Sequence, residues 1–221
     1  MKSGTIRAPF TLSKTPVQMI CLDMEGVLVP EIWIEVSKRT GIAALARTTR
    51  DEPDYDKLMR ARIALLAQHR LTLADIQNVI DGMGPMDGAQ TFLDDLRSRY
   101  QVLILSDTFY EFAQPLMRQL GWPTLLCHKL EVDAAGFVRR HVLRMPDPKR
   151  HAVNAMRGLN FQVIAAGDSY NDTGMLEAAH AGFFIHAPAV ITAQFPQFPV
   201  TRNYAELKAA IDAAAAALRA A

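Results

Sequence analysis

Two carboxylates, one residue apart, close the first apolar run of the chain. The run 19–22 has strand length, and it ends in Asp23 and Glu25 with Gly26 directly after them. Such a run before a turn signal predicts a buried strand of a parallel sheet. Alternate residues of an extended chain point the same way, so both acids can face one pocket, where one attacks and the other moves protons. An isolated pair of this kind is also typical of a helix cap or a solvated turn.

Two further apolar runs end in residues of the same kinds. Ser106 and Asp107 follow the run 102–105, and Asp168, Asn171 and Asp172 follow the run 163–166. In a parallel sheet the carboxyl ends of the strands lie at one edge, where open α/β sheets bind their ligands. The sequence therefore predicts that these polar groups converge with Asp23.

Acids gathered at one edge repel one another unless a cation neutralises them. A hard divalent ion such as Mg²⁺, held by carboxylates, waters and a substrate phosphate, suits that task. Lys149 follows Pro148 at the start of a predicted helix, where it could offer a positive charge to a phosphoryl group. An acid pair, a hydroxyl, a lysine and a metal-binding acid are the components of phosphoryl transfer through an aspartyl phosphate.

The elements that position these residues alternate between helix and strand from residue 87 onward. Apolar periodicity predicts helices over 89–99, 111–120, 148–156 and 204–221, and strands over 102–105, 124–127, 163–166 and 182–185. Gly136 marks the turn of a predicted hairpin over 132–143. This alternation predicts an α/β fold with a doubly wound, mostly parallel, Rossmann-like sheet.

A different pattern separates the first strand from this region. Apolar stripes over 32–45, 58–66 and 73–80 have helical spacing, with Gly41 as a predicted helix end and Thr72 as a predicted cap. We find no convincing strand pattern between residues 31 and 83. We therefore predict a small helical bundle over 31–85, inserted into a core of 17–30 and 86–221, with 1–16 as an N-terminal extension.

Length and composition limit the classes of protein to which the chain can belong. With 221 residues, 50% of them hydrophobic and 21% charged, it can bury a sizeable core. Its 24 basic and 23 acidic residues nearly balance, so no overall charge favours nucleic acid or an anionic membrane. No apolar run approaches the roughly 18 to 20 residues of a membrane span, and residues 1–16 lack the apolar segment of a secretory signal.

The cysteines and histidines indicate the cellular compartment of the protein and whether it has a zinc site. Cys21 and Cys127 both lie in apolar runs, which favours buried free thiols in a reducing cytoplasm over a disulfide. The six histidines show no paired spacing of the kind that binds zinc. We therefore expect a cytoplasmic protein without a zinc site. The apolar surface of the inserted bundle is compatible with a homodimer.

Four ordered motifs resemble those of the haloacid dehalogenase superfamily of phosphatases. They are Cys21-Leu22-Asp23-Met24-Glu25-Gly26, Ser106-Asp107, Lys149 and Gly167-Asp168-Ser169-Tyr170-Asn171-Asp172. The helical insertion after the first motif is similar to the cap of the phosphoserine phosphatase branch. The segments 22–33, 104–112, 165–172 and 195–199 resemble the bifunctional phosphoserine phosphatase/homoserine phosphotransferase branch, and the likeness runs from about residue 19 to about residue 207.

The first motif departs from the superfamily pattern, which usually has Asp at the second acidic position and Thr or Ser two residues later. This chain has Glu25 and Val27 at those positions. The longer side chain of Glu25 leaves acid–base chemistry open but puts the positioning of water in doubt. The bifunctional branch shows the same two residues, so we interpret them as a feature of that branch.

The resemblance implies a Mg²⁺-dependent enzyme that hydrolyses phosphoserine and also transfers the phosphoryl group to homoserine. Asp23 would attack phosphorus, and Glu25 would protonate the leaving oxygen and then deprotonate the incoming water or alcohol. Asp23, Asp168 and the backbone carbonyl of Glu25 would hold Mg²⁺. Ser106 and Lys149 would hold the phosphoryl oxygens that are not transferred and spread the charge of the transition state.

The same resemblance assigns the remaining site residues. Asp107 and Asn171 would bind the substrate, and Asp172 would steady Lys149 or the surroundings of the metal. On the inserted bundle, Glu31 would pair with the ammonium group of the substrate. Arg62 would fork onto its carboxylate, a planar match that lysine cannot reproduce.

Simpler roles stay open for several of these residues. Ser106 alone is typical of a turn, and Lys149 alone of a solvated surface. Glu31 and Asp172 could serve only as acids at helix N-termini. Arg60 lies two residues from Arg62 on a different face of the same predicted helix, so one of the two should face water; the family spacing favours Arg62 for the site.

Two other functions also stay open. The fold could belong to a phosphatase for another small phosphomonoester, and the insertion would then decide the substrate. Alternatively, Asp23 could be a phospho-accepting switch, as in a response-regulator receiver, which signals through a partner without turnover. Receivers carry no helical insertion after the first strand, however, and Glu25 in the same pocket would shorten the lifetime of a phosphoaspartate.

Overall fold

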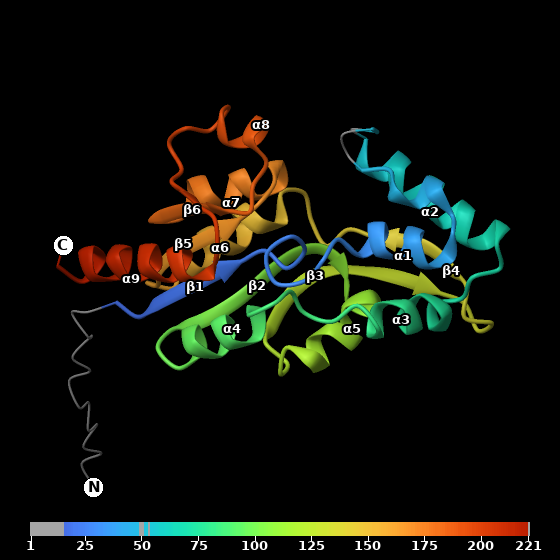
Figure 1. Ribbon diagram of the computed structural model, residues 1–221, viewed down its shortest axis with the longest axis horizontal. Coiled ribbons are helices and arrows are strands. Elements are labelled where there is room, and N and C mark those ends of the chain that lie inside the picture. Colours follow the sequence, from blue (N-terminus) through green and yellow to red (C-terminus); the bar gives the residue numbers. More distant parts are fainter. Residues whose placement is uncertain (1–15, 49–50, 53, 221) are drawn as a thin grey trace, which may run out of the picture.

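A seven-stranded sheet forms the centre of the computed structural model, which describes residues 16–48, 51–52 and 54–220 (Figure 1). The strands are β1 (Gln18–Leu22), β2 (Gln101–Phe109), β3 (Thr124–Val132), β4 (Val138–Val142), β5 (Gln162–Gly167), β6 (Ala181–Ile185) and β7 (Val200–Thr201). Their order is β4-β3-β2-β1-β5-β6-β7, and each neighbouring pair is parallel except β3 and β4. The predicted mostly parallel α/β fold is confirmed. The predicted extension over 1–16 lies outside the described residues, except for Pro16.

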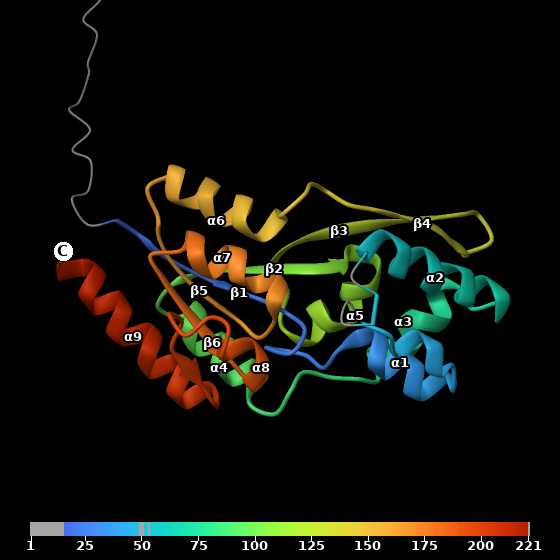
Figure 2. The ribbon, with the colours of Figure 1, turned by 90° about the horizontal axis from the view of Figure 1, so that it is seen from above.

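Helices cover both faces of the sheet (Figure 2). On one face lie α4 (Ala89–Arg97), α5 (Tyr110–Gln119) and α9 (Tyr204–Ala220); on the other lie α6 (Pro148–Gly158) and α7 (Thr173–Ala178). Successive strand residues point to opposite faces, so Ile20 and Leu22 pack into the core beside α4, α5 and α9. Cys21, between them, packs into the core beside α6 and α7. The first strand is therefore covered on both sides, which is why its sequence is continuously apolar.

The carboxyl ends of β1, β2 and β5 meet at one edge of the sheet. Leu22 at the end of β1 lies opposite Ile104 on one side and Ala166 on the other. The predicted strand over 102–105 continues as β2 through Ser106 and Asp107 to Phe109, with a register shift against β3 on the way. Apolar periodicity stops at residue 105, whereas backbone pairing with β3 resumes at Phe109, so the sequence pattern underestimates this strand.

Within the described residues, the chain between β1 and α4 is helical. It forms α1 (Ile32–Thr40), the 3₁₀ segment η1 (Ala43–Ala46), α2 (Tyr55–Gln68) and α3 (Leu73–Asp81), which we call the inserted helices. Gly41 ends α1 with a left-handed φ of 72°, as predicted, so Leu45 lies in η1 rather than in a longer α1. The hydroxyl of Thr72 caps α3 by accepting from the Asp75 amide at 3.3 Å. The division into a core of 17–30 and 86–221 and a cap of 31–85 stays a prediction.

The inserted helices pack against α5 and against the hairpin of β3 and β4 (Figure 1). The Gln77 side chain donates to the Glu111 carbonyl oxygen at 2.7 Å, and the Leu73 amide donates to the Gly136 carbonyl oxygen at 2.8 Å. Gly136 lies in the hairpin turn with a φ of 84°, as predicted. Because β3 runs on from residue 127 to Val132, the hairpin extends beyond the sheet edge and supports the inserted helices there.

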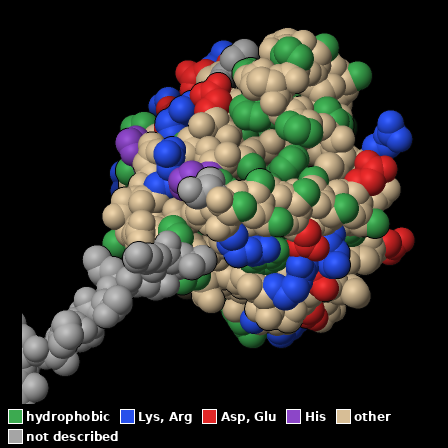
Figure 3. All heavy atoms as spheres, turned by 90° about the vertical axis from the view of Figure 1, so that its left-hand side faces the viewer, with side chains coloured by type: hydrophobic (Ala, Val, Ile, Leu, Met, Phe, Trp, Pro, Cys, Tyr) green, Lys and Arg blue, Asp and Glu red, His purple; other side chains and the backbone are tan. Residues whose placement is uncertain are grey.

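Two short helical segments complete the described elements. They are η2 (Tyr170–Asp172) and α8 (Ala189–Thr192). None of the helices among the described residues has the length and apolarity to cross a membrane. Cys21 and Cys127 are buried and free, as predicted. On the face that Figure 3 shows, acidic and basic side chains lie side by side in the lower part, and hydrophobic side chains gather above them.

Candidate active site

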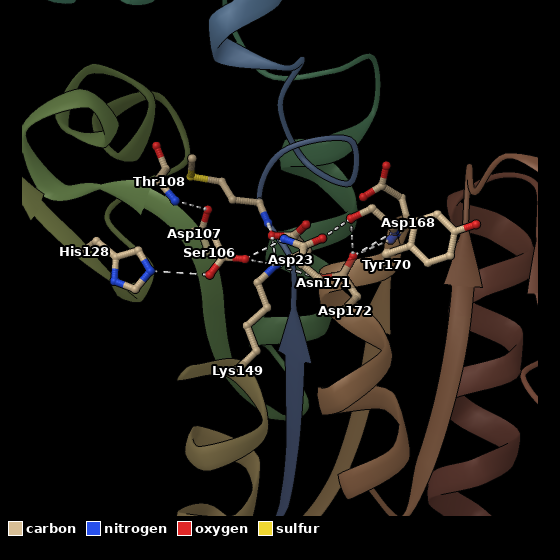
Figure 4. A network of polar contacts seen from close by, with 12 residues as sticks. Asp23, Ser106, Asp107, Thr108, His128, Lys149, Asp168, Tyr170, Asn171 and Asp172 are labelled. Atoms are coloured by element: carbon tan, nitrogen blue, oxygen red, sulfur yellow. Dashed lines mark hydrogen bonds and ion pairs between the residues drawn. The ribbon is translucent and has the colours of Figure 1, made fainter. Parts of the chain in front are cut away.

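The carboxylate of Asp23 lies at the end of β1 and is almost fully buried (Figure 4). The Asp23 amide donates to the Ala166 carbonyl oxygen at 3.0 Å, which extends the pairing of β1 and β5 by one residue. One carboxylate oxygen, Oδ1, accepts from the Met24 amide at 2.7 Å and lies 2.9 Å from Lys149 Nζ. Burial, followed by the nearby charge of Asp172, raises the pKa of Asp23 well above its ordinary value, although Lys149 opposes this.

The ammonium group of Lys149 is the buried counter-charge of this edge. Helix α6 begins at Pro148, the position that proline favours, and Lys149 follows at the first turn. Its Nζ lies 2.7 Å from Asp172, 2.9 Å from Asp23 and 3.8 Å from Asp107. Burial acts to lower the pKa of Lys149, but the charges of Asp172, Asp23 and Asp107 raise it well above its ordinary value. Lys149 is therefore a fixed cation that holds three carboxylates together.

Asp172 is fully buried and serves mainly to hold this arrangement. Its Oδ2 accepts from the amides of Asp168 and Ser169, both at 2.9 Å, while Oδ1 accepts from Lys149. A side chain at Gly167 would overlap the Asp172 carboxylate, so glycine is needed at the end of β5. The carboxylate therefore fixes the turn that carries Asp168.

Asp168 completes a cluster of three carboxylates with Asp23 and Asp172. One oxygen of each lies within 4.8 Å of the others, close enough to hold one metal ion. Burial, and then the charges of Asp172 and Glu31, raise the pKa of Asp168 to about 7. The donor set is oxygen only and carries excess negative charge, which fits a hard divalent cation such as Mg²⁺. The carboxylate of Glu25 is not part of this cluster.

The carboxylate of Glu25 faces the same cavity from the turn that follows β1. Its Oε2 accepts from the Ile32 amide at 2.9 Å, at the start of α1. Burial, followed by the charge of Glu31, raises the pKa of Glu25 to about 8. A carboxyl group that retains its proton near neutral pH can act as a general acid.

Asp107 and Asn171 connect the ends of β2 and β5 across the end of β1. Asn171 Nδ2 donates to Asp107 Oδ2 at 2.5 Å. Burial acts to raise the pKa of Asp107, but the charge of Lys149 and the contacts with His128 and Asn171 hold it below its ordinary value. Ser106 is buried beside Asp107, and its hydroxyl oxygen accepts from the Thr108 amide at 3.2 Å.

The inserted helices supply the opposite wall. Arg62 of α2 is 7% exposed, lies over the Trp33 ring at 4.6 Å, and donates to the Arg47 carbonyl oxygen at 2.6 Å. Among the described residues its buried Nε has no hydrogen-bond partner. Burial lowers the pKa of Arg62 to about 10. Arg60, by contrast, is exposed and pairs with Asp56, so Arg62 is the arginine that faces the cavity.

A cavity of about 380 Å³ separates the sheet edge from the inserted helices. Its lining includes eight of the predicted site residues, namely Asp23, Glu25, Glu31, Arg62, Ser106, Asp107, Asp168 and Asn171. Lys149 and Asp172 lie behind the lining, where Lys149 contacts both Asp23 and Asp172. The structure thus brings all ten predicted residues together around one cavity.

Two residues at this site were missed by the sequence reasoning. Tyr55, at the start of α2, lines the cavity and donates its hydroxyl to the Asp107 carbonyl oxygen at 2.9 Å. His128 of β3 lies 3.5 Å from Asp107 Oδ1. The only sequence signal was their placement: Tyr55 lies between two acids, and His128 directly follows an apolar run. Neither pattern indicates where the side chain points.

Sequence comparison extends the geometric findings. The family model of the haloacid dehalogenase-like hydrolases matches residues 17–180. The phosphoserine phosphatase ThrH of Pseudomonas aeruginosa is 59% identical over 192 residues, which cover 87% of this chain and 94% of that protein. A phosphoserine phosphatase of Pseudomonas syringae pv. tomato is 57% identical over 192 residues, which cover 87% of this chain and 81% of that protein.

Solved structures share the fold at lower identity. One is a phospho-aspartyl intermediate analogue of phosphoserine phosphatase, with a TM-score of 0.70 and 17% identity, over 87% of this chain and 97% of that one. Another is the phosphoserine phosphatase of T. onnurineus, with a TM-score of 0.68 and 19% identity, over 90% of this chain and 96% of that one. Because the family model matches well over half of the chain and two relatives are more than half identical to it, this protein belongs to the haloacid dehalogenase-like hydrolases.

Proposed function

We propose that this enzyme hydrolyses phosphoserine through an aspartyl phosphate on Asp23, and that it also transfers the phosphoryl group to homoserine. The observation that carries the proposal is the cavity itself. A buried carboxylate paired with Lys149 lies on one side, and Arg62, with an unpartnered buried Nε, lies on the other. Both relatives described above carry the name phosphoserine phosphatase.

The first half of the reaction would use Asp23 and Glu25. A carboxylate oxygen of Asp23 attacks phosphorus, the bond between phosphorus and the serine oxygen breaks, and Glu25 gives its proton to that oxygen. A pKa of about 8 keeps Glu25 protonated for this step near neutral pH. In the second half, Glu25 takes a proton from water, which attacks phosphorus and releases Asp23 and inorganic phosphate.

A bound Mg²⁺ would neutralise the negative charge that the substrate phosphate adds to this carboxylate cluster. Asp23, Asp168 and the backbone carbonyl of Glu25 would hold the ion. Asp172 belongs to the same cluster, but its oxygens already accept from Lys149 and from two backbone amides. Its role is therefore to steady Lys149 and Asp168.

The substrate would be recognised from both sides of the cavity. Ser106, Asn171 and Lys149 would hold the phosphoryl oxygens, on the sheet side. On the other side, the Arg62 guanidinium would bind the amino-acid carboxylate and Glu31 the ammonium group. Glu31 directly precedes α1, but its side chain makes no capping hydrogen bond to that helix.

Transfer to homoserine would follow the same second half, with an alcohol in place of water. It requires that the cavity exclude water while the aspartyl phosphate exists. Trp33, Ile34, Leu58 and Ile191 give the cavity an apolar lining next to its charged floor. This lining supports the transfer reaction.

The two alternative functions fit the site less well. A phospho-accepting switch would need a long-lived phosphoaspartate, yet Glu25 lies in the same cavity as Asp23. A phosphatase for a different phosphomonoester would leave the opposite charges of Glu31 and Arg62, which both line the cavity, without a use. A cytoplasmic location and a homodimer stay predictions.

The test is phosphorus NMR of phosphoserine with Mg²⁺, with and without homoserine. We expect inorganic phosphate in both cases and phosphohomoserine when homoserine is present. Asp23→Asn should abolish both products, whereas Asp94→Asn, an exposed carboxylate on α4, should change neither. Equal turnover by wild type and Asp23→Asn would eliminate Asp23 as the nucleophile, and a persistent phosphoprotein without phosphate release would favour the switch.

A further inference from the structure

A buried imidazole lies directly behind the cavity. His128 lies on β3 and is 3% exposed (Figure 4). In the strand register it lies opposite Phe109 of β2. It is not part of the cavity lining, and the mechanism above does not use it. A histidine buried among aromatic and apolar residues can simply fill space, so its two ring nitrogens decide whether it does more.

The first nitrogen fixes the tautomer of the ring. Nδ1 of His128 accepts from the Arg144 backbone amide at 3.1 Å. A backbone amide can only donate, so Nδ1 must carry a lone pair, and the hydrogen of the neutral ring must be on Nε2. The segment after β4, which carries Arg144, therefore fixes the tautomer in which His128 donates from Nε2.

The second nitrogen points at Asp107. Nε2 of His128 lies 3.5 Å from Asp107 Oδ1, while the other oxygen, Oδ2, accepts from Asn171 Nδ2 at 2.5 Å and lies 3.8 Å from Lys149 Nζ. The two oxygens of Asp107 thus face opposite partners. The separation of 3.5 Å is long for a hydrogen bond, and such contacts commonly shorten when the reacting complex forms.

Asn171 is the link to the substrate. Its Nδ2 donates to Asp107 and its Oδ1 accepts from the Ser169 hydroxyl, so the orientation of the amide is set from both ends. Asn171 lines the cavity, and the second hydrogen on its Nδ2 can donate to a group bound there. If Asp107 rotates, Oδ2 no longer faces Asn171, and the amide loses the acceptor that orients it.

We propose that His128 is a positioning residue: its Nε2–H holds Asp107 so that Asp107 orients the amide of Asn171 and shares the ammonium group of Lys149. The polar chain runs from Arg144, after β4, through His128 and Asp107 to Asn171 in η2, and it passes the end of β1. This inference rests on the proposed function, because Asn171 and Lys149 matter to the extent that they hold a phosphoryl group.

Two amide substitutions separate the two ring nitrogens. In His128→Asn, the side-chain oxygen can replace Nδ1 as acceptor for the Arg144 amide, but nothing reaches Asp107. In His128→Gln, the longer side chain places an N–H group where Nε2 lies, and it can donate to Asp107. Both substitutions remove the ring, but Gln keeps one methylene more than Asn, so a role in packing alone would appear as a difference in the unfolding midpoint.

The measurement is steady-state hydrolysis of phosphoserine with saturating Mg²⁺, together with urea unfolding of each variant. We expect His128→Asn to lower kcat about 10- to 100-fold, as the displacement of a reacting group does, with KM changed less than kcat. His128→Gln should recover most of kcat at a similar unfolding midpoint. Equal activity of wild type and both variants, or equal loss in both variants together with a lowered midpoint, would overturn the proposal.

A second readout keeps this inference separate from the proposed function. Nitrogen NMR of the wild-type imidazoles distinguishes a ring protonated at Nε2 from one protonated at Nδ1 or at both nitrogens. We expect His128 in the Nε2–H form, with an Nε2 signal that shifts in Asp107→Asn. If the enzyme released no phosphate from phosphoserine, the proposed function would fail, and this signal would still decide the contact with Asp107. A ring protonated at Nδ1, or an Nε2 signal indifferent to Asp107→Asn, would end the proposal.

Discussion

A methyl group added at Gly26 should lower the activity of the enzyme by more than the loss of stability explains. Gly26 follows Glu25 with a φ of 73°, and a Cβ there would overlap the Asp168 carboxylate, whose more distant oxygen would be only 3.0 Å away. Gly26→Ala therefore has two effects. The left-handed backbone costs about 1–2 kcal/mol for a residue with a Cβ, and the Asp168 carboxylate must move.

Gly41 offers a matched control on α1. Its φ is 72°, and a Cβ added there would have nothing within 4 Å. Gly41→Ala therefore carries the same backbone cost without the overlap. For a chain of this size, a loss of about 1–2 kcal/mol lowers Tm by about 2–8 °C, and we expect Gly41→Ala to show this loss with unchanged kcat.

Gly26→Ala should show at least the same loss of Tm and, in addition, a much lower rate. To restore van der Waals contact, the Asp168 carboxylate must move by about 1 Å, and a misplacement of that size costs about 100-fold in rate. The assays are thermal unfolding, phosphoserine hydrolysis and the Mg²⁺ concentration at half-maximal activity, which should rise in Gly26→Ala alone. Full activity in Gly26→Ala, or equal inactivation of both variants, would refute the argument that Gly26 acts through Asp168.

Three further predictions concern charge. Arg62→Lys should raise KM for phosphoserine about 10- to 100-fold, the value of a charged hydrogen bond, but leave KM unchanged for a phosphomonoester without a carboxylate; a similar rise for both substrates would count against Arg62 as the carboxylate ligand. The pKa of Glu25, about 8, reflects burial and then the charge of Glu31, so Glu31→Gln should lower it and move the alkaline decline of kcat/KM to lower pH; an unmoved pH profile would contradict this coupling. Lys149→Met should destabilise the fold by about 3–5 kcal/mol, because it leaves buried carboxylates unpaired. Since those carboxylates bind protons as the pH falls, the deficit in urea unfolding should be smaller at pH 5 than at pH 8; a deficit that grew on acidification would contradict the assignment.

The cluster of acids was predictable because it depends on features that are written in the sequence. Apolar runs of strand length locate β1 and β5, and right-handed crossovers bring the carboxyl ends of parallel strands to one edge. Asp23 and Asp168, distant in the chain, therefore had to approach one another. The ends of α1 and α3 were predictable for a similar reason, because the φ of 72° at Gly41 and the capping box of Thr72 are local chemistry.

The features that were not predicted depend on docking between elements. The extension of β2 beyond residue 105 rests on pairing with β3, which apolar periodicity does not encode. The Tyr55 hydroxyl reaches the Asp107 carbonyl oxygen only because α2 packs beside the hairpin. His128 faces Asp107 through the parallel register of β2 and β3. Residue types alone indicate which groups can react, whereas these contacts depend on the relative placement of helices and strands.

The central place of β1 in the sheet has a consequence for how the chain folds. This strand precedes the other strands of the sheet in the chain, yet it pairs on one side with β5, and Gln18 at its start donates to the Ala215 carbonyl oxygen of α9 at 2.7 Å. Asp23 can therefore acquire its surroundings only after Lys149 of α6 and the turn that follows β5 have left the ribosome. Contacts between such distant segments slow folding, and C-terminal truncations that remove α9 should impair maturation of the protein rather than leave a smaller working domain.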